Sequence, residues 1–164
     1  NFIHSLQFFM NLKSFLKDGG VLVLDRSTPS NIIYQVARSM KDSEELNVAS
    51  TKAWNLAYKI EQLEYNVLEL PRPDAVVYLS LNRSINKKLM ETAEEIKGNN
   101  KKDFHESDEQ LLDRVSEIGL QFAKKCSWHV VECYNHDTKE IYPKEVILTN
   151  ILKTLSRDLN IPAK

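Results

Sequence analysis

Residues 20–35 read GVLVLDRSTPSNIIYQ, in which a short apolar run leads directly into charged and hydroxyl side chains. The run at 21–24 (VLVL) has no alternating polar positions, which is typical of a strand buried on both faces of a parallel sheet. The apolar spacing that follows, over 29–40, is helical. A strand that enters a helix through a polar turn predicts an α/β fold, with a ligand site beyond the carboxyl end of the strand.

Two more apolar runs repeat this arrangement, at 75–81 (AVVYLSL) and 128–133 (WHVVEC). Gly19 and Gly20 predict the end of the first helix, and Pro143 predicts the first turn of the last one. The predicted helices cover residues 2–16, 29–40, 51–65, 84–98, 107–125 and 143–159. Alternating strands and helices predict one domain over residues 1–164, with helices on both faces of a parallel sheet.

The composition excludes several classes of protein. Among 164 residues, 22 Lys and Arg nearly balance 23 Asp and Glu, so binding of nucleic acid by bulk charge is not expected. No apolar run reaches the roughly 18 residues of a membrane span, and the N-terminal apolar segment lacks the basic start of a signal peptide. Cys126 and Cys133 lack the spacing of a zinc site and are expected to be reduced thiols. We therefore expect a cytoplasmic protein, with the nucleus and mitochondrion as alternatives.

The first candidate site follows the first apolar run. Its polar side chains are Asp25, Arg26, Ser30, Asn31, Tyr34 and Gln35. An arginine at a strand end can grip a phosphate through its planar fork, and the N-terminus of the next helix favours an anion. One turn further on, Tyr34 and Gln35 are placed to touch a sugar or a base. On spacing alone, a surface ion pair between Asp25 and Arg26, with Ser30 as a helix cap, is an equal alternative.

Two further candidates follow the other runs. After 75–81 come Arg83, Lys87 and Lys88, in a polar stretch that reads as a lid over 84–106 and can close over a polyphosphate. Spacing alone favours a solvated helix face there. His136 and Asp137 form a weak metal pair, for which a surface loop is the better interpretation. The chain contains no GxSxG, HExxH or GxxxxGK[ST] motif.

The order of these motifs resembles the thymidylate kinase family of P-loop nucleoside-monophosphate kinases. Residues 20–35 resemble the family's strand, DRY and AYQ signature, and 70–74 (LPRPD) with the following run resemble its LPxPD strand. Residues 103–106 (DFHE) resemble the segment after the lid, and 128–132 the last strand. The resemblance implies a three-layer α/β/α P-loop fold that moves the γ-phosphoryl group of Mg²⁺·ATP onto dTMP to give dTDP. It also implies Mg²⁺ bound with ATP and, as in many family members, a homodimer.

The resemblance also implies roles for the candidate residues. Arg26 would hold the phosphate of dTMP, and Asp25 would orient Arg26 and help to place Mg²⁺ and its waters. Asn31 and Tyr34 would line the nucleoside pocket, with Tyr34 where a 2′-hydroxyl would clash. Ser30 matches the signature serine, and Gln35 is a weaker candidate for the same pocket. The lid residues Arg83, Lys87 and Lys88 would approach the transferring group.

The chain departs from the family pattern in four respects. It has no P-loop and no strand before the first helix, so we expect a sheet that lacks its first strands, with a gap between the strands ending at Asp25 and Leu81. Ser27 replaces the usual Tyr or His, no Arg precedes Arg26 to read thymine, and the lid has lysines where the family has arginines. The leading expectation is an N-terminally truncated thymidylate kinase. A deoxynucleoside kinase, a UMP/CMP kinase and a catalytically inactive binding module remain alternatives.

Overall fold

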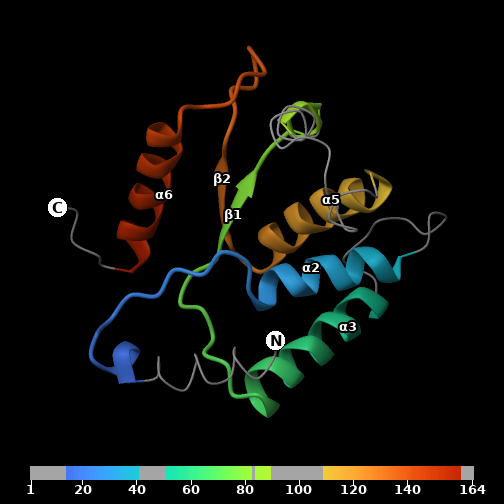
Figure 1. The fold of residues 1–164 in the computed structure, drawn as a ribbon. Coiled ribbons are helices and arrows are strands. Elements are labelled where there is room, and N and C mark those ends of the chain that lie inside the picture. The colour runs from blue at the N-terminus through green and yellow to red at the C-terminus, as the bar shows by residue number, and fades with distance from the viewer. Residues whose placement is uncertain (1–13, 41–50, 83, 90–108, 160–164) are drawn as a thin grey trace, which may run out of the picture.

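The computed structural model describes residues 14–40, 51–82, 84–89 and 109–159, and its centre is a parallel pair of strands (Figure 1). Strand β1 (Val77–Ser80) pairs with β2 (His129–Glu132), with Val77 opposite His129 and Ser80 opposite Glu132. Because parallel strands need a crossover connection, the chain returns between them through α5 (Glu109–Lys125). The architecture is thus mixed helix and sheet, as the alternating pattern predicts.

Helices lie on both sides of this pair (Figure 1). Helix α6 (Lys144–Asp158) contacts β2 from one side, and α5 contacts both strands from the other. Helix α2 (Thr28–Ser39) packs on α5, and α3 (Thr51–Glu61) packs on α2. The buried core shared by α2, α3 and α5 consists of Ile32, Ile33, Val36, Ala37, Met40, Ala53, Ala57, Leu111, Ile118 and Phe122. This core fixes α2, which carries the first candidate site.

Most of the predicted elements are confirmed within the described residues. Residues 14–17 are helical, and Gly19 has a left-handed φ of 83°, so the predicted helix end is confirmed. The last helix begins at Lys144, with Pro143 as its N-cap and not in its first turn. The predicted helix at 51–65 continues into a π-helix, η1 (Gln62–Val67). Residues 2–13, most of the predicted lid and residues 103–106 lie outside the described residues.

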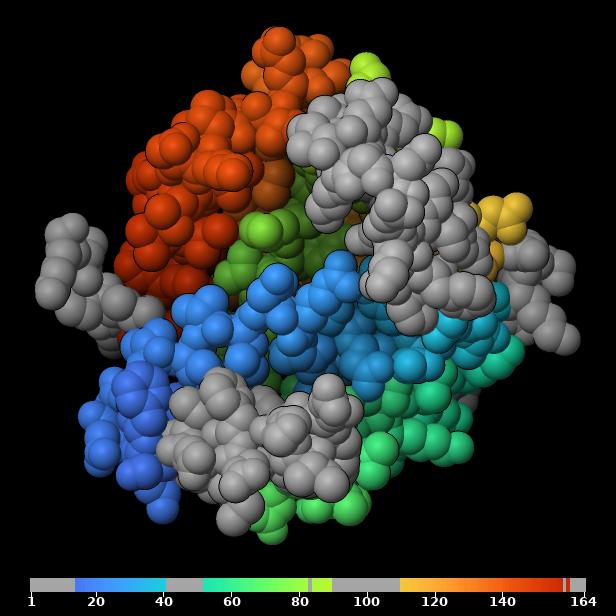
Figure 2. Space-filling view, in the orientation of Figure 1, coloured from blue at the N-terminus to red at the C-terminus, as the bar shows by residue number. Residues whose placement is uncertain are grey.

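The predicted strand at 21–24 is wrong for this structure. The segment is irregular, and Val21 and Val23 are 67% and 87% exposed. A strand needs a neighbour for its backbone groups, and within the described residues the sheet contains only β1 and β2. The expected burial of both sheet faces is also incomplete, since Leu79 of β1 is 52% exposed. Figure 2 shows green surface around β1 in a hollow between α6 and the blue segment that precedes α2.

Candidate functional site

The N-terminal end of α2 gathers the side chains of the first candidate site. Ser27 is the N-cap residue and Pro29 lies in the first turn, where its fixed φ suits a helix. The cap is therefore Ser27, and Ser30 lies inside the helix as a partly exposed residue. Asp25 is exposed in the bend before the cap. The start of α2 is thus set by residues that directly follow the charged side chains of Asp25 and Arg26.

Arg26 has a strained backbone conformation. Its φ is 61°, in the left-handed region that costs an L-residue about 1–2 kcal/mol. The guanidinium carbon lies 5.7 Å from the centroid of the ring of Tyr34, the seventh residue of α2. Strain of this kind persists where the surrounding structure imposes it, and it concentrates at functional sites. The exposed guanidinium is therefore held over an aromatic ring at the surface.

A carboxylate from a distant part of the chain organises the first turns of α2. Thr28 Oγ1 donates a hydrogen bond to Glu64 Oε2 at 2.5 Å, and Asn31 Nδ2 donates to Glu64 Oε1 at 2.6 Å. Gln35 Nε2 in turn donates to Asn31 Oδ1 at 3.4 Å. Glu64 belongs to η1, and π-helical segments are rare and frequently lie at functional sites. The structure thus brings Asn31 and Gln35 together and adds Thr28 and Glu64 to them.

A second arginine joins this cluster through Tyr65. The Arg72 guanidinium carbon lies 4.3 Å from the Tyr65 ring centroid, and Arg72 donates to Asn66 Oδ1 at 3.5 Å. Tyr65 shares a side-chain hydrogen bond with Thr28. Burial is the largest cause that raises the pKa of the Tyr65 hydroxyl, opposed by the Thr28 hydrogen bond. The arginine of the LPRPD motif is therefore connected to the start of α2.

Sequence reasoning missed Thr28, Glu64, Tyr65 and Arg72 as members of the site. Glu64 and Asn31 are 33 residues apart, so no local spacing connects them. The one available signal was the position of Glu64 and Tyr65 at a helix end just before LPRPD. That signal points to a junction between elements, and it does not identify the helix that the carboxylate contacts.

The basic residues of the predicted lid lie elsewhere. Lys87 and Lys88 are exposed on the helical turn at 84–89, which begins where Asn82 Oδ1 accepts from the backbone nitrogen of Ser84 at 2.9 Å. In Figure 1 this turn lies beyond the arrowhead of β1, whereas the N-terminus of α2 lies toward the other end of the strands. The structure does not bring the two lysines to Arg26. Arg83 lies outside the described residues.

The third candidate region forms a surface loop after β2, as expected. His136 Nε2 lies 2.8 Å from Glu132 Oε2, and His136 Nδ1 lies 3.3 Å from the Tyr134 hydroxyl. Tyr134 also bridges to Ile141 across the loop. Asp137 donates its backbone N–H to Asn135 Oδ1 at 2.8 Å, which is a turn contact. Within the described ranges, no three His, Cys, Asp or Glu side chains are arranged to hold a metal ion.

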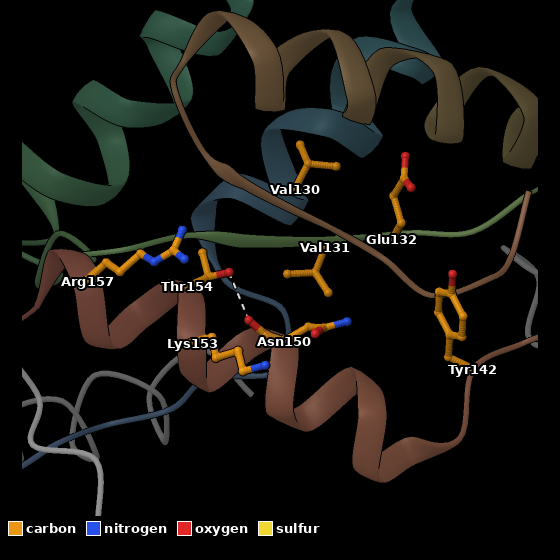
Figure 3. Close-up of a pocket in the computed structure, with 8 residues that line it drawn as sticks. All are labelled: Val130, Val131, Glu132, Tyr142, Asn150, Lys153, Thr154 and Arg157. Carbon is orange, nitrogen blue, oxygen red and sulfur yellow. Dashed lines mark hydrogen bonds between the residues drawn. The ribbon is translucent and has the colours of Figure 1, made fainter.

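An open hollow of about 560 Å³ lies between β2 and α6 (Figure 3). It is lined by Val130, Val131, Glu132, Tyr142, Asn150, Lys153, Thr154 and Arg157. Thr154 Oγ1 donates to the backbone carbonyl of Asn150 at 2.8 Å, so this hydroxyl is already used within α6. The hollow combines apolar strand residues with separate charged side chains and lies away from the cluster on α2.

In the part of the chain that the structure describes, no helix has the length and apolar character needed to cross a membrane. Neither the family models nor the curated proteins compared with this chain give a match. A function for this chain is therefore inferred from the chemistry of the α2 cluster.

Proposed function

We propose that this chain carries the acceptor-binding part of a thymidylate kinase-like enzyme, which phosphorylates dTMP to dTDP with ATP. The observation that supports this most directly is the set of side chains at the start of α2. There an exposed guanidinium lies over the Tyr34 ring, next to a hydrogen-bonded pair of amides, Asn31 and Gln35. A guanidinium suits a phosphate, an aromatic ring suits a sugar, and amides suit a base edge. A site that recognises a nucleoside monophosphate requires groups of all three kinds, because the ligand contains a phosphate, a sugar and a base.

Phosphoryl transfer depends on positioning and charge neutralisation more than on covalent chemistry. In the proposed enzyme Arg26 binds the phosphate of dTMP, and an oxygen of that phosphate attacks the γ-phosphorus of ATP while the bond to ADP breaks. Mg²⁺, when bound with ATP, neutralises charge on the phosphates. Mg²⁺ keeps several waters and takes one or two carboxylates, so the exposed Asp25 beside Arg26 fits it. Tyr34 would contact the deoxyribose.

The proposed three-layer P-loop fold requires another strand between residues 21–24 and β1. The exposure of Val21, Val23 and Leu79 supports this, because these side chains belong to runs with the composition of buried strands. In that fold the inserted strand would carry the phosphate-binding loop. It would also turn residues 21–24 into a strand whose carboxyl end meets that of β1. Asp25 and Arg26 would then approach Asn82 and the lid.

A second candidate function is a nucleotide-binding module without catalysis. The observation that favours it is the position of Lys87 and Lys88, toward the opposite end of the strands from the N-terminus of α2 (Figure 1). Bound dTMP would then contact Arg26 at a distance from Lys87 and Lys88, the two lid cations among the described residues. This candidate predicts binding of dTMP and no turnover.

The first experiment measures binding of dTMP and of thymidine to the 164-residue chain by isothermal titration calorimetry. Removing a hydrogen bond to a charged group costs about 1.5–3 kcal/mol, so Arg26→Ala should weaken dTMP binding roughly 10- to 150-fold. Thymidine, which has no phosphate, should be much less affected. Arg38→Ala is the matched control, since Arg38 is an exposed arginine in the last turn of α2.

A second assay separates the two candidates. The full-length protein is mixed with ATP, Mg²⁺ and dTMP, and formation of dTDP is followed. Turnover supports the kinase, whereas dTMP binding without turnover supports the binding module. Absence of dTMP binding by the wild-type chain would overturn both.

A further inference from the structure

Glu64 uses both of its carboxylate oxygens on α2. Oε2 accepts from Thr28 and Oε1 accepts from Asn31, at 2.5 and 2.6 Å. Thr28 is only 5% exposed, so its hydroxyl is a fixed anchor for the carboxylate. The backbone around Glu64 is also fixed, because its carbonyl accepts from Leu70 N–H at 3.0 Å where η1 ends. Glu64 is therefore fixed by hydrogen bonds at both its carboxylate and its backbone carbonyl.

This contact decides which way the Asn31 amide points. A carboxylate is an acceptor only, so the group of Asn31 that faces it must be the NH₂. The carbonyl oxygen Oδ1 therefore faces away from Glu64. Its neighbour there is Gln35 Nε2, at a long 3.4 Å, and a carbonyl oxygen has a second lone pair for another donor. Asn31 is thus oriented to offer an acceptor to a ligand on the outer side of α2.

The orientation has a consequence for base recognition, which rests on the proposed function. Thymine and uracil carry a hydrogen on ring nitrogen N3, whereas cytosine has a lone pair at that position. We propose that Glu64 is a positioning residue that makes the site selective for pyrimidines with an N3–H donor, by fixing Asn31 Oδ1 toward the base. A cytosine in the same place would put its N3 acceptor opposite the Asn31 Oδ1 acceptor, and no hydrogen bond could form between them. Without Glu64 the amide can turn over and offer its NH₂ to cytosine N3.

The test compares binding of dTMP, dUMP and dCMP to the same chain by calorimetry. The wild type should prefer dTMP and dUMP over dCMP by about tenfold or more. Glu64→Ala should reduce this preference to about twofold or less, mainly by weakening dTMP and dUMP binding. Glu61→Ala is the matched control, because it removes the same charge three residues earlier and should keep the preference. Thermal melting by circular dichroism checks that each variant is folded.

A charge-swapped pair keeps the test independent of the stability of Glu64→Ala. In Asn31→Asp alone, two carboxylates would face each other across the 2.6 Å contact, so the variant should bind all three nucleotides weakly. In the double variant Asn31→Asp with Glu64→Gln, the amide introduced at position 64 donates to one oxygen of the carboxylate introduced at position 31. The other oxygen of that carboxylate accepts from N3–H. The preference for dTMP and dUMP should return in the double variant.

The outcomes separate the inference from the proposed function. If the wild type binds dTMP and dCMP with equal affinity, the role of Glu64 in selection is overturned while acceptor binding stands. The same holds if Glu64→Ala weakens the binding of all three nucleotides by the same factor. A double variant that binds dTMP no better than Asn31→Asp would also overturn it. If the wild type binds none of the three, both proposals are overturned.

Discussion

Replacing Arg26 with glycine should separate the stability of the protein from its affinity for a nucleotide. Glycine adopts the observed φ of 61° freely, so the substitution removes a strain of about 1–2 kcal/mol. Against this gain stand the lost contact with the Tyr34 ring, worth about 0.5–1 kcal/mol at an exposed site, and about 0.4–1 kcal/mol of added chain entropy in the unfolded state. The free energy of unfolding should therefore change by less than about 1 kcal/mol.

For a chain of 164 residues this limit corresponds to a shift in Tm of less than about 4 °C. Affinity for dTMP should nevertheless fall roughly 10- to 150-fold, because the phosphate loses its charged partner. Lys139→Gly is the matched control, since Lys139 has a φ of 59° and is also a cation, in the loop after β2. It should relieve similar strain and leave dTMP binding unchanged.

The assays are thermal melting by circular dichroism and calorimetric titration with dTMP. A fall in Tm of more than about 10 °C in Arg26→Gly would show that Arg26 is structural, contrary to our reasoning. Unchanged dTMP affinity would show that Arg26 does not bind the phosphate. Arg26→Lys should bind dTMP with intermediate affinity, because it keeps the charge and loses the planar fork.

Three further predictions concern the scaffold. Gly119→Ala should destabilise the protein by about 1 kcal/mol in thermal melts, because the added Cβ would lie 2.7 Å from the Tyr78 ring and overpacking outweighs the better helix propensity of alanine. In a Tyr78→Leu background the same change should stabilise it, and stabilisation in both backgrounds would refute the clash. Burial raises the pKa of Tyr78 and of Tyr65, so their contribution to stability is complete below pH 10.0 and is lost as the pH rises further, because the unfolded state releases its protons first. Urea midpoints should fall above that pH, and less so in Tyr78→Phe. Iodoacetamide should modify the exposed Cys126 in the native protein and the buried Cys133 only on unfolding, as peptide mass mapping would show.

The helices are predictable because their signals are local. In α2 the apolar residues Ile32, Ile33 and Val36 recur at helical spacing, and they are buried as that spacing predicts. The glycine at 19 ends its helix through its own φ. Strands depend on partners. The runs around β1 and β2 pair with each other, whereas residues 21–24 have similar composition and remain irregular. Composition predicts that a segment suits a strand, and the pairing decides whether it forms one.

The same distinction applies to the site. Arg26, Tyr34, Asn31 and Gln35 lie within ten residues of one another, so the sequence could place them on one end of a helix. The carboxylate that orients Asn31 comes from a π-helix in another part of the chain. Only the packing of α3 on α2 brings Glu64 there, and that packing depends on core residues that carry no signal of the contact. Long-range polar contacts of this kind are set by tertiary structure.

The two unmet expectations, the missing strand at 21–24 and the separation of the lid lysines from Arg26, have one physical cause in our proposal. Val21 and Val23 are exposed in a segment suited to a strand, and within the described residues β1 has a strand on one edge only. Exposed apolar side chains and an unpaired strand edge are both unfavourable, and one inserted strand would bury the side chains and pair the edge. Because strands in a parallel sheet end at a common edge, that insertion would also fix where Arg26 lies relative to Asn82. Catalysis, as distinct from binding, would therefore depend on completing the sheet, whereas the contacts of Glu64 with Thr28 and Asn31 are present without it.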